Sequence, residues 1–146
     1  MGKLIIFTGV SGGGKTLAMQ CFEESGYYVT DNIPVSVVEE YFNVIEKDPK
    51  KYAKVALTVT LANAKETFEL TRKHKNFETT IVGITCSAPV LNERFRLTRK
   101  LHPRQVEGLS LDKCINDDLV LIRSLRDYFD IFIDCICVFM DNNKCF

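Results

Sequence analysis

Apolar residues along the chain alternate between short continuous runs and longer stretches with helical spacing. Five runs rich in β-branched and aromatic residues have the length of strands, at residues 4–8, 27–30, 54–61, 79–86 and 128–138. Helical spacing is found at residues 17–22, 34–45, 64–75, 89–97 and 110–125. Strands that alternate with helices predict βαβ units, and therefore a three-layer α/β domain with a five-stranded parallel sheet flanked by helices.

Local signals mark several boundaries between these elements. Gly26 is suited to the end of the first helix, and Pro34 to the first turn of the next. Ser110 can cap the last helix. Residues 101–109 contain Pro103 and Gly108, so we expect a loop there.

Composition narrows the classes of protein. The 146 residues suffice for one domain, which we expect to span residues 1–146. Lys and Arg together number 19, as do Asp and Glu, so no net charge attracts the protein to nucleic acid. No apolar run approaches the roughly 20 residues of a membrane span, and the glycine-rich segment described next begins too early for a signal peptide. We therefore predict a cytoplasmic protein with no membrane partner.

The segment at residues 9–16 reads G-x-x-x-x-G-K-T, the Walker A pattern of a phosphate-binding loop (P-loop), with a predicted strand before it and a helix after it. Glycines let successive backbone N–H groups converge on phosphate oxygens, and the helix adds its positive dipole end. Lys15 is predicted to neutralise the β- and γ-phosphates, with a catalytic as well as a binding role, and Thr16 is predicted to ligate Mg²⁺. The predicted nucleotide-binding residues of the loop are Gly9, Val10, Ser11, Gly12, Gly13, Gly14, Lys15 and Thr16.

An acidic residue at a strand end usually helps a P-loop protein to hold Mg²⁺. The third and fourth predicted strands end without one, near Thr60 and Thr85. Asp31, at the end of the second, is the best substitute, and we predict a catalytic and metal-binding role for it; the alternative is a solvated turn or cap. Asp134, near the end of the fifth predicted strand, is a second and less favoured candidate.

Positive charge is concentrated in one segment, and two of its residues, Arg96 and Arg99, are predicted to contact phosphates as part of a mobile basic lid. A solvated helix face and an RNA-binding patch are the alternatives. Neither His74 nor His102 has a visible nucleophile partner, so we do not favour a catalytic role for them. The basic segment comprises Arg94, Arg96, Arg99, Lys100, His102 and Arg104.

The six cysteines form no C-x-x-C pair, and most lie in apolar runs. We expect buried, reduced thiols rather than a metal site or disulfides.

Several segments together resemble the N-terminal domain of the RapZ/YvcJ family: FTGVSGGGKTLAM, GYYVTDNIPV, ERFRLTRKLHP, GLSLDKCI and FDIFIDC. The similarity runs from about residue 3 to residue 135. D-N-x-P after the second predicted strand, with T-R-[KR]-x-H-P downstream, is more distinctive than the loop itself. The resemblance implies a kinase-like P-loop NTPase fold, binding of ATP and GTP, and weak hydrolysis of both.

The same resemblance identifies departures from the family. Its second nucleotide-binding segment, D-[VA]-R-[NS], falls on residues 60–63, where only Asn63 fits and the acid and arginine are missing. The family often has an acid where this chain has Thr85. These two departures bear on GTP recognition and on hydrolysis. Family members also continue into a C-terminal domain that engages RNA in RapZ, an adapter that presents small RNAs to an RNase. We expect no RNA binding from residues 1–146.

Four functions are compatible with the sequence, and the least favoured is an RNA-binding module with salt-dependent affinity carried by residues 94–104. The leading hypothesis is a regulatory protein that binds ATP or GTP with Mg²⁺, hydrolyses them weakly and has a protein partner. The second is a small-molecule or nucleotide kinase, in which Asp31 would orient or deprotonate an acceptor. The third is a nucleotide sensor without catalysis, whose lid changes state when nucleotide binds.

Overall fold

The computed structural model describes residues 2–98 and 101–135. Five strands alternate with five α-helices along the chain, and two short 3₁₀ helices flank the last α-helix. In chain order the elements are β1 (Gly2–Gly9), α1 (Lys15–Glu24), β2 (Tyr28–Thr30), α2 (Val35–Lys47), β3 (Lys54–Thr58), α3 (Leu61–Thr71), β4 (Phe77–Cys86), α4 (Ala88–Thr98), η1 (Pro103–Glu107), α5 (Leu111–Ser124), η2 (Arg126–Tyr128) and β5 (Ile131–Cys135).

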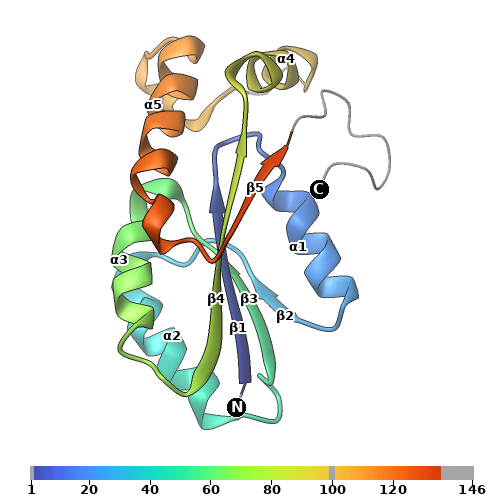
Figure 1. The fold of residues 1–146 in the computed structure, drawn as a ribbon, viewed down its shortest axis with the longest axis vertical. Helices are drawn as coiled ribbons and strands as arrows, with labels where there is room; N and C mark the ends of the chain where they lie inside the picture. The colour runs from blue at the N-terminus through green and yellow to red at the C-terminus, as the bar shows by residue number, and fades with distance from the viewer. Residues whose placement is uncertain (1, 99–100, 136–146) are drawn as a thin grey trace.

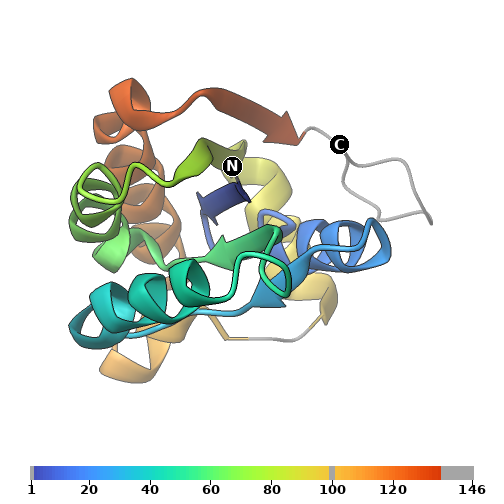
Figure 2. The same cartoon turned by 90° about the horizontal axis from the view of Figure 1, so that it is seen from below.

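The strands form one sheet in the order β2-β3-β1-β4-β5, and every neighbouring pair is parallel. The sheet is the middle of three layers: α1 covers one face, and α2, α3 and α5 cover the other (Figure 2). Helix α4 crosses the end of the sheet at which the strands finish (Figure 1). The predicted three-layer α/β architecture with five parallel strands is confirmed.

Strand β1 lies at the centre of the sheet and contributes to both faces. Leu4 and Ile6 belong to the larger core cluster, which includes Phe42 of α2 and Phe68 of α3. Phe7 belongs to the smaller cluster beneath α1. Alternate residues of a strand point to opposite faces, so the apolar run of β1 anchors both helical layers. Because β1 is fixed from both sides, so is the start of the loop that follows it.

Several boundaries differ from the prediction. The fifth strand begins at Ile131, because Tyr128 belongs to η2, and α3 ends at Thr71 and not at residue 75. The run at 54–61 was expected to be one strand, but β3 ends at Thr58 and α3 begins at Leu61. Leu61 is buried at the helix start, so its apolar character reflects packing of α3 and does not continue the strand. The expected loop at 101–109 contains η1, with His102 as its N-cap. The last three residues of the predicted fifth strand, 136–138, lie outside the described residues.

Helix boundaries follow the local signals. Gly26 follows α1 with a φ of +85°, which favours glycine, and Pro34 immediately precedes α2. The Ser110 hydroxyl accepts a hydrogen bond from the backbone N–H of Lys113 at 3.3 Å and so caps α5. No helix in the described part of the chain is long and apolar enough to cross a membrane.

The described cysteines only partly match the expectation of buried thiols. Cys86 and Cys114 are buried and unbridged, whereas Cys21 on α1 is an exposed thiol. Among residues 2–98 and 101–135 no group of three or more His, Cys, Asp or Glu side chains could hold a metal ion.

Candidate functional site

The P-loop joins the end of β1, the central strand, to the start of α1. A Cβ on Gly9 would lie 2.6 Å from the Ile84 carbonyl oxygen of β4, so only glycine fits at the start of the loop. Gly14, at the N-cap of α1, has a φ of +105°, which other residues rarely adopt. The loop is closed internally by a hydrogen bond from Gly13 N–H to the Val10 carbonyl at 2.9 Å.

The N-terminus of α1 is suited to an anion. Gly14 provides no side-chain cap, and no acidic residue lies in the first turn. The first N–H groups of a helix have no partner within the helix, and the helix dipole favours negative charge there. Thr16 lies in this first turn and is exposed. The carboxyl ends of parallel strands are also where ligands of α/β sheets bind.

Lys15, the first residue of α1, has its ammonium in a partly desolvated, acidic environment. Burial lowers the pKa of Lys15 below its usual value, while the carboxylates of Asp118 and Asp31 act in the opposite direction. Both carboxylates therefore act electrostatically on the same ammonium, although they come from α5 and from the end of β2. A desolvated cation at this position interacts strongly with an incoming phosphate.

Asp31 lies directly after β2 and is exposed. Its carboxylate accepts a hydrogen bond from the buried hydroxyl of Thr58, and that hydroxyl accepts the Asn32 N–H at 2.9 Å. Asn32 has a φ of +45°, a left-handed conformation that Asn tolerates better than most residues. This turn holds Asp31 at the carboxyl end of the strands, which is the end of the sheet that carries the P-loop.

Side chains of helix α4 contact the P-loop and support its backbone. Arg94 is buried, and among its contacts its guanidinium donates to the Gly12 carbonyl at 2.8 Å and to the Cys86 sulfur at 3.3 Å. The ring of Phe95 and the side chain of Leu91 lie against Gly12, where an added Cβ would approach Phe95 to 3.3 Å. The sequence analysis placed Arg94 in the basic segment, where a lid was one of the alternatives; its guanidinium instead supports the loop from within the structure.

Asp118, which the sequence analysis missed, also reaches the loop, and His102, which it undervalued, contacts Asp118. Asp118 of α5 accepts a hydrogen bond from the Ser11 N–H at 3.2 Å, and its Oδ2 lies 2.8 Å from His102 Nε2. A sequence signal for Asp118 existed: it follows Ile115 by three residues and precedes Ile122 by four, so it falls on the buried face of α5. A carboxylate on a buried helix face needs a partner, and here the partners are the loop and His102.

The other predicted site residues lie as follows. Asn63, in the first turn of α3, is half-buried at the carboxyl end of the strands, where the P-loop also lies. Arg96 is exposed and pairs with Glu93 of its own helix at 2.5 Å. Asp134 is exposed near the end of β5. Arg99 lies outside the described residues. Nucleotide contacts by Asn63, Arg96 and Arg99 remain predictions.

The chemistry of the donors suits Mg²⁺ when a nucleotide is present. Mg²⁺ is commonly held by one or two protein oxygens together with phosphates and water. Thr16 supplies an exposed hydroxyl and Asp31 an exposed carboxylate, both at the carboxyl end of the strands, where the P-loop lies.

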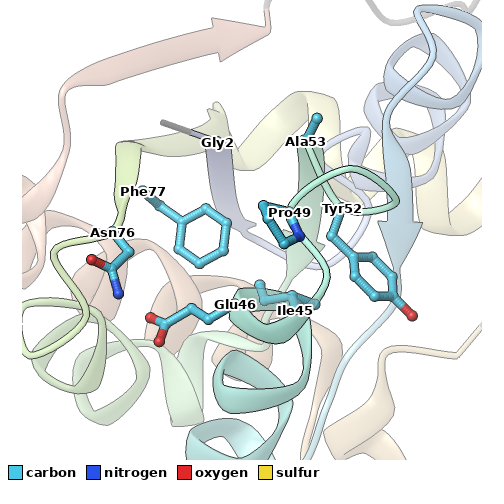
Figure 3. A pocket seen from close by; sticks show the side chains of 8 residues that line it. All are labelled: Gly2, Ile45, Glu46, Pro49, Tyr52, Ala53, Asn76 and Phe77. Atoms are coloured by element: carbon cyan, nitrogen blue, oxygen red, sulfur yellow. The ribbon is translucent and has the colours of Figure 1, made fainter.

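A separate pocket of about 330 Å³ opens at the other end of the sheet, where the parallel strands begin (Figure 3). There His74 Nδ1 lies 2.8 Å from the Glu46 carboxylate, joining the end of α3 to the end of α2. His74 therefore belongs to this end of the sheet and not to the P-loop. The pocket is lined by Gly2, Ile45, Glu46, Pro49, Tyr52, Ala53, Asn76 and Phe77.

Comparison with known proteins gives a consistent assignment. A family model described as the RapZ-like N-terminal domain matches residues 2–142. An RNase adapter protein RapZ from Hamiltonella defensa is 31% identical over 136 residues, covering 90% of this chain and 47% of the relative. A protein from Oceanobacillus iheyensis described as nucleotide-binding is 32% identical over 138 residues, with 90% and 47% covered. The chain thus spans about half the length of these curated relatives.

Solved structures share the fold at low sequence identity. A shikimate kinase from Bacteroides thetaiotaomicron has a TM-score of 0.58 at 14% identity, covering 97% of this chain and 90% of that one. A sugar kinase from Janibacter has a TM-score of 0.59 at 12% identity, with 92% and 86% covered. These similarities establish a kinase-like P-loop fold.

Proposed function

The chain belongs to the RapZ-like N-terminal domain family, and on that premise we propose that it binds ATP, and also GTP, with Mg²⁺ at the P-loop as a regulatory nucleotide-binding protein. The observation that carries the proposal is the G-x-x-x-x-G-K-T loop, which joins the central strand to a helix whose first turn has no side-chain cap. The names of the relatives, one an RNase adapter and one nucleotide-binding, support it.

Each residue of the loop has a distinct task in this proposal. Backbone N–H groups of Gly12 and of residues 14–16 donate to phosphate oxygens, while the Gly13 N–H closes the loop onto Val10. Lys15 neutralises the charge of the β- and γ-phosphates. Thr16 and Asp31 contribute oxygens to Mg²⁺, which when bound offsets phosphate charge. Arg94 holds the Gly12 carbonyl so that the loop is already shaped before the ligand arrives.

Hydrolysis in this proposal is slow. The strand next to β1 ends in Thr58 and α3 starts after Thr60, so neither position offers a carboxylate to a metal-bound nucleotide. Asp31 follows β2, one strand further from β1. Among the described residues it is the one carboxylate at a strand end on that side of β1. The regulatory role in this proposal rests on the nucleotide-bound state, which a protein partner would recognise.

A kinase is the second candidate, favoured by the exposure of Asp31 at the edge of the sheet, where a small acceptor could reach it. The two functions differ in turnover. A kinase transfers phosphate to an acceptor far faster than to water, whereas a sensor without catalysis binds nucleotide and releases no phosphate.

The test is isothermal titration of ATP and of GTP, each with and without Mg²⁺. We expect micromolar binding that depends on Mg²⁺, and a loss of affinity of at least about tenfold in Lys15→Ala because a charged phosphate contact is removed. Lys47→Ala is the matched control: Lys47 is an exposed lysine at the far end of α2. Failure of the folded native protein to bind either nucleotide would refute the proposal, and a phosphate-release assay then separates weak hydrolysis from sensing alone.

A further inference from the structure

Asp118 of α5 introduces a carboxylate into a loop that is built to receive phosphate. Its Oδ2 accepts the Ser11 N–H at 3.2 Å, so one backbone donor of the P-loop is already engaged with an anion from the protein itself. The side chain of Asp118 is 13% exposed, so solvent screens this charge only in part. Nothing in the mechanism above uses this contact.

His102 fixes Asp118 in this position. The imidazole is 2% exposed, and the Phe95 ring packs against it with centroids 5.6 Å apart. The backbone N–H of Arg104 donates to His102 Nδ1 at 3.1 Å, so Nδ1 carries no proton. The proton of the neutral ring is therefore on Nε2, which donates to Asp118 at 2.8 Å. Both ring nitrogens are engaged, so His102 acts as a positioning residue and Asp118 stays an acceptor with its charge.

The charge of Asp118 acts on the part of the loop that is assigned to the terminal phosphates. Asp118 interacts electrostatically with Lys15, the residue assigned to the β- and γ-phosphates, and it bonds directly to Ser11 of the same loop. A diphosphate ends before the γ position, whereas a triphosphate adds another charged group there. The triphosphate therefore meets repulsion from Asp118 that the diphosphate largely avoids.

We propose that Asp118, held by His102 on the Ser11 N–H, sets the preference of the loop between nucleoside di- and triphosphates. The affinity of the site for a diphosphate, relative to that for a triphosphate, is therefore higher than in a P-loop without this carboxylate. Binding of a triphosphate requires Asp118 to leave Ser11, and because Asp118 is joined to His102, the change passes to η1 and α5. The inference rests on the proposed nucleotide-binding function and adds to it the ligand that the site distinguishes.

The test compares the dissociation constants of ADP and ATP, both with Mg²⁺, in the native protein and in Asp118→Asn. Asparagine keeps an oxygen that can accept from Ser11 and His102 but carries no charge. We expect ATP affinity to rise about tenfold and ADP affinity by less than about threefold. Asp117→Asn is the matched control, because its carboxylate pairs with Arg104 at 2.9 Å and not with the loop; it should leave the ADP-to-ATP ratio unchanged.

A second measurement uses the native protein and does not depend on how the variants fold. Hydrogen exchange with the β,γ-imido analogue of ATP should be faster in η1 and in the first half of α5 than with ADP, because the analogue displaces Asp118. Equal exchange with the two ligands, an unchanged affinity ratio in Asp118→Asn, or an equal change in Asp117→Asn would overturn the inference. Absence of binding by both nucleotides would instead refute the proposed function.

Discussion

Replacing Arg94 with Met tests whether α4 holds the P-loop in place. The guanidinium donates to the Gly12 carbonyl at 2.8 Å, the length of a charge-assisted hydrogen bond, and the residue is 8% exposed. Such a bond contributes about 1.5–3 kcal/mol, and removing a desolvated charge recovers about 1 kcal/mol of that. Methionine keeps much of the apolar packing, so we expect Arg94→Met to lower the free energy of unfolding by about 1–2 kcal/mol.

The same variant should also weaken nucleotide binding, because the loop must then be ordered by the ligand. We expect a roughly tenfold higher Kd for ADP, which equals about 1.4 kcal/mol of ordering cost. Urea unfolding followed by circular dichroism gives the stability, and titration calorimetry gives the affinity. Arg123→Met is the control, an exposed arginine in the last turn of α5. If Arg94→Met matches the native protein in both assays, the reasoning about loop support is wrong.

Two further predictions concern the loop itself. Burial lowers the pKa of Lys15, so this side chain loses its positive charge at a lower pH than an ordinary lysine, whose pKa is about 10.4. ADP affinity should therefore fall as the pH rises through the lowered pKa of Lys15. In Lys15→Arg the affinity should stay level, and titrations at stepped pH measure both. Gly9→Ala should destabilise the fold by about 1–3 kcal/mol, because its Cβ would lie 2.6 Å from the Ile84 carbonyl oxygen. Lys47→Ala, at an exposed position of α2, should cost less in the same urea experiment.

The sequence was sufficient for the sheet and for the loop because both depend on local signals. An apolar run such as that of β1 must be buried on both faces, and G-x-x-x-x-G-K-T between a strand and a helix has a narrow structural meaning. The boundary between β3 and α3 was less accessible. Val59 and Leu61 continue the apolar pattern of the strand, but the chain has already turned toward a helix, and burial alone does not distinguish the two states.

The supports of the loop could be predicted only in part, because they come from residues far along the chain. Arg94 and Asp118 reach the loop across separations of 82 and 107 residues, and no local pattern specifies such contacts. Arg94 was recognised as part of a basic segment, yet its charge alone could not distinguish a lid from an internal support. Asp118 lay beside Asp117 in sequence, and only the helical phase separates the carboxylate that turns inward from the one that stays at the surface.

The charges around the loop also explain why Mg²⁺ should strengthen nucleotide binding. Two cations, Lys15 and Arg94, and two carboxylates, Asp31 and Asp118, lie around the loop, so these four side chains sum to zero. Nucleotide phosphates bring several negative charges into a partly desolvated site, where uncompensated charge is costly. The helix dipole supplies only about half a positive charge. The remaining compensation must come from a metal ion or from further basic residues of the protein. The Mg²⁺ dependence of binding therefore measures the share that the metal ion supplies.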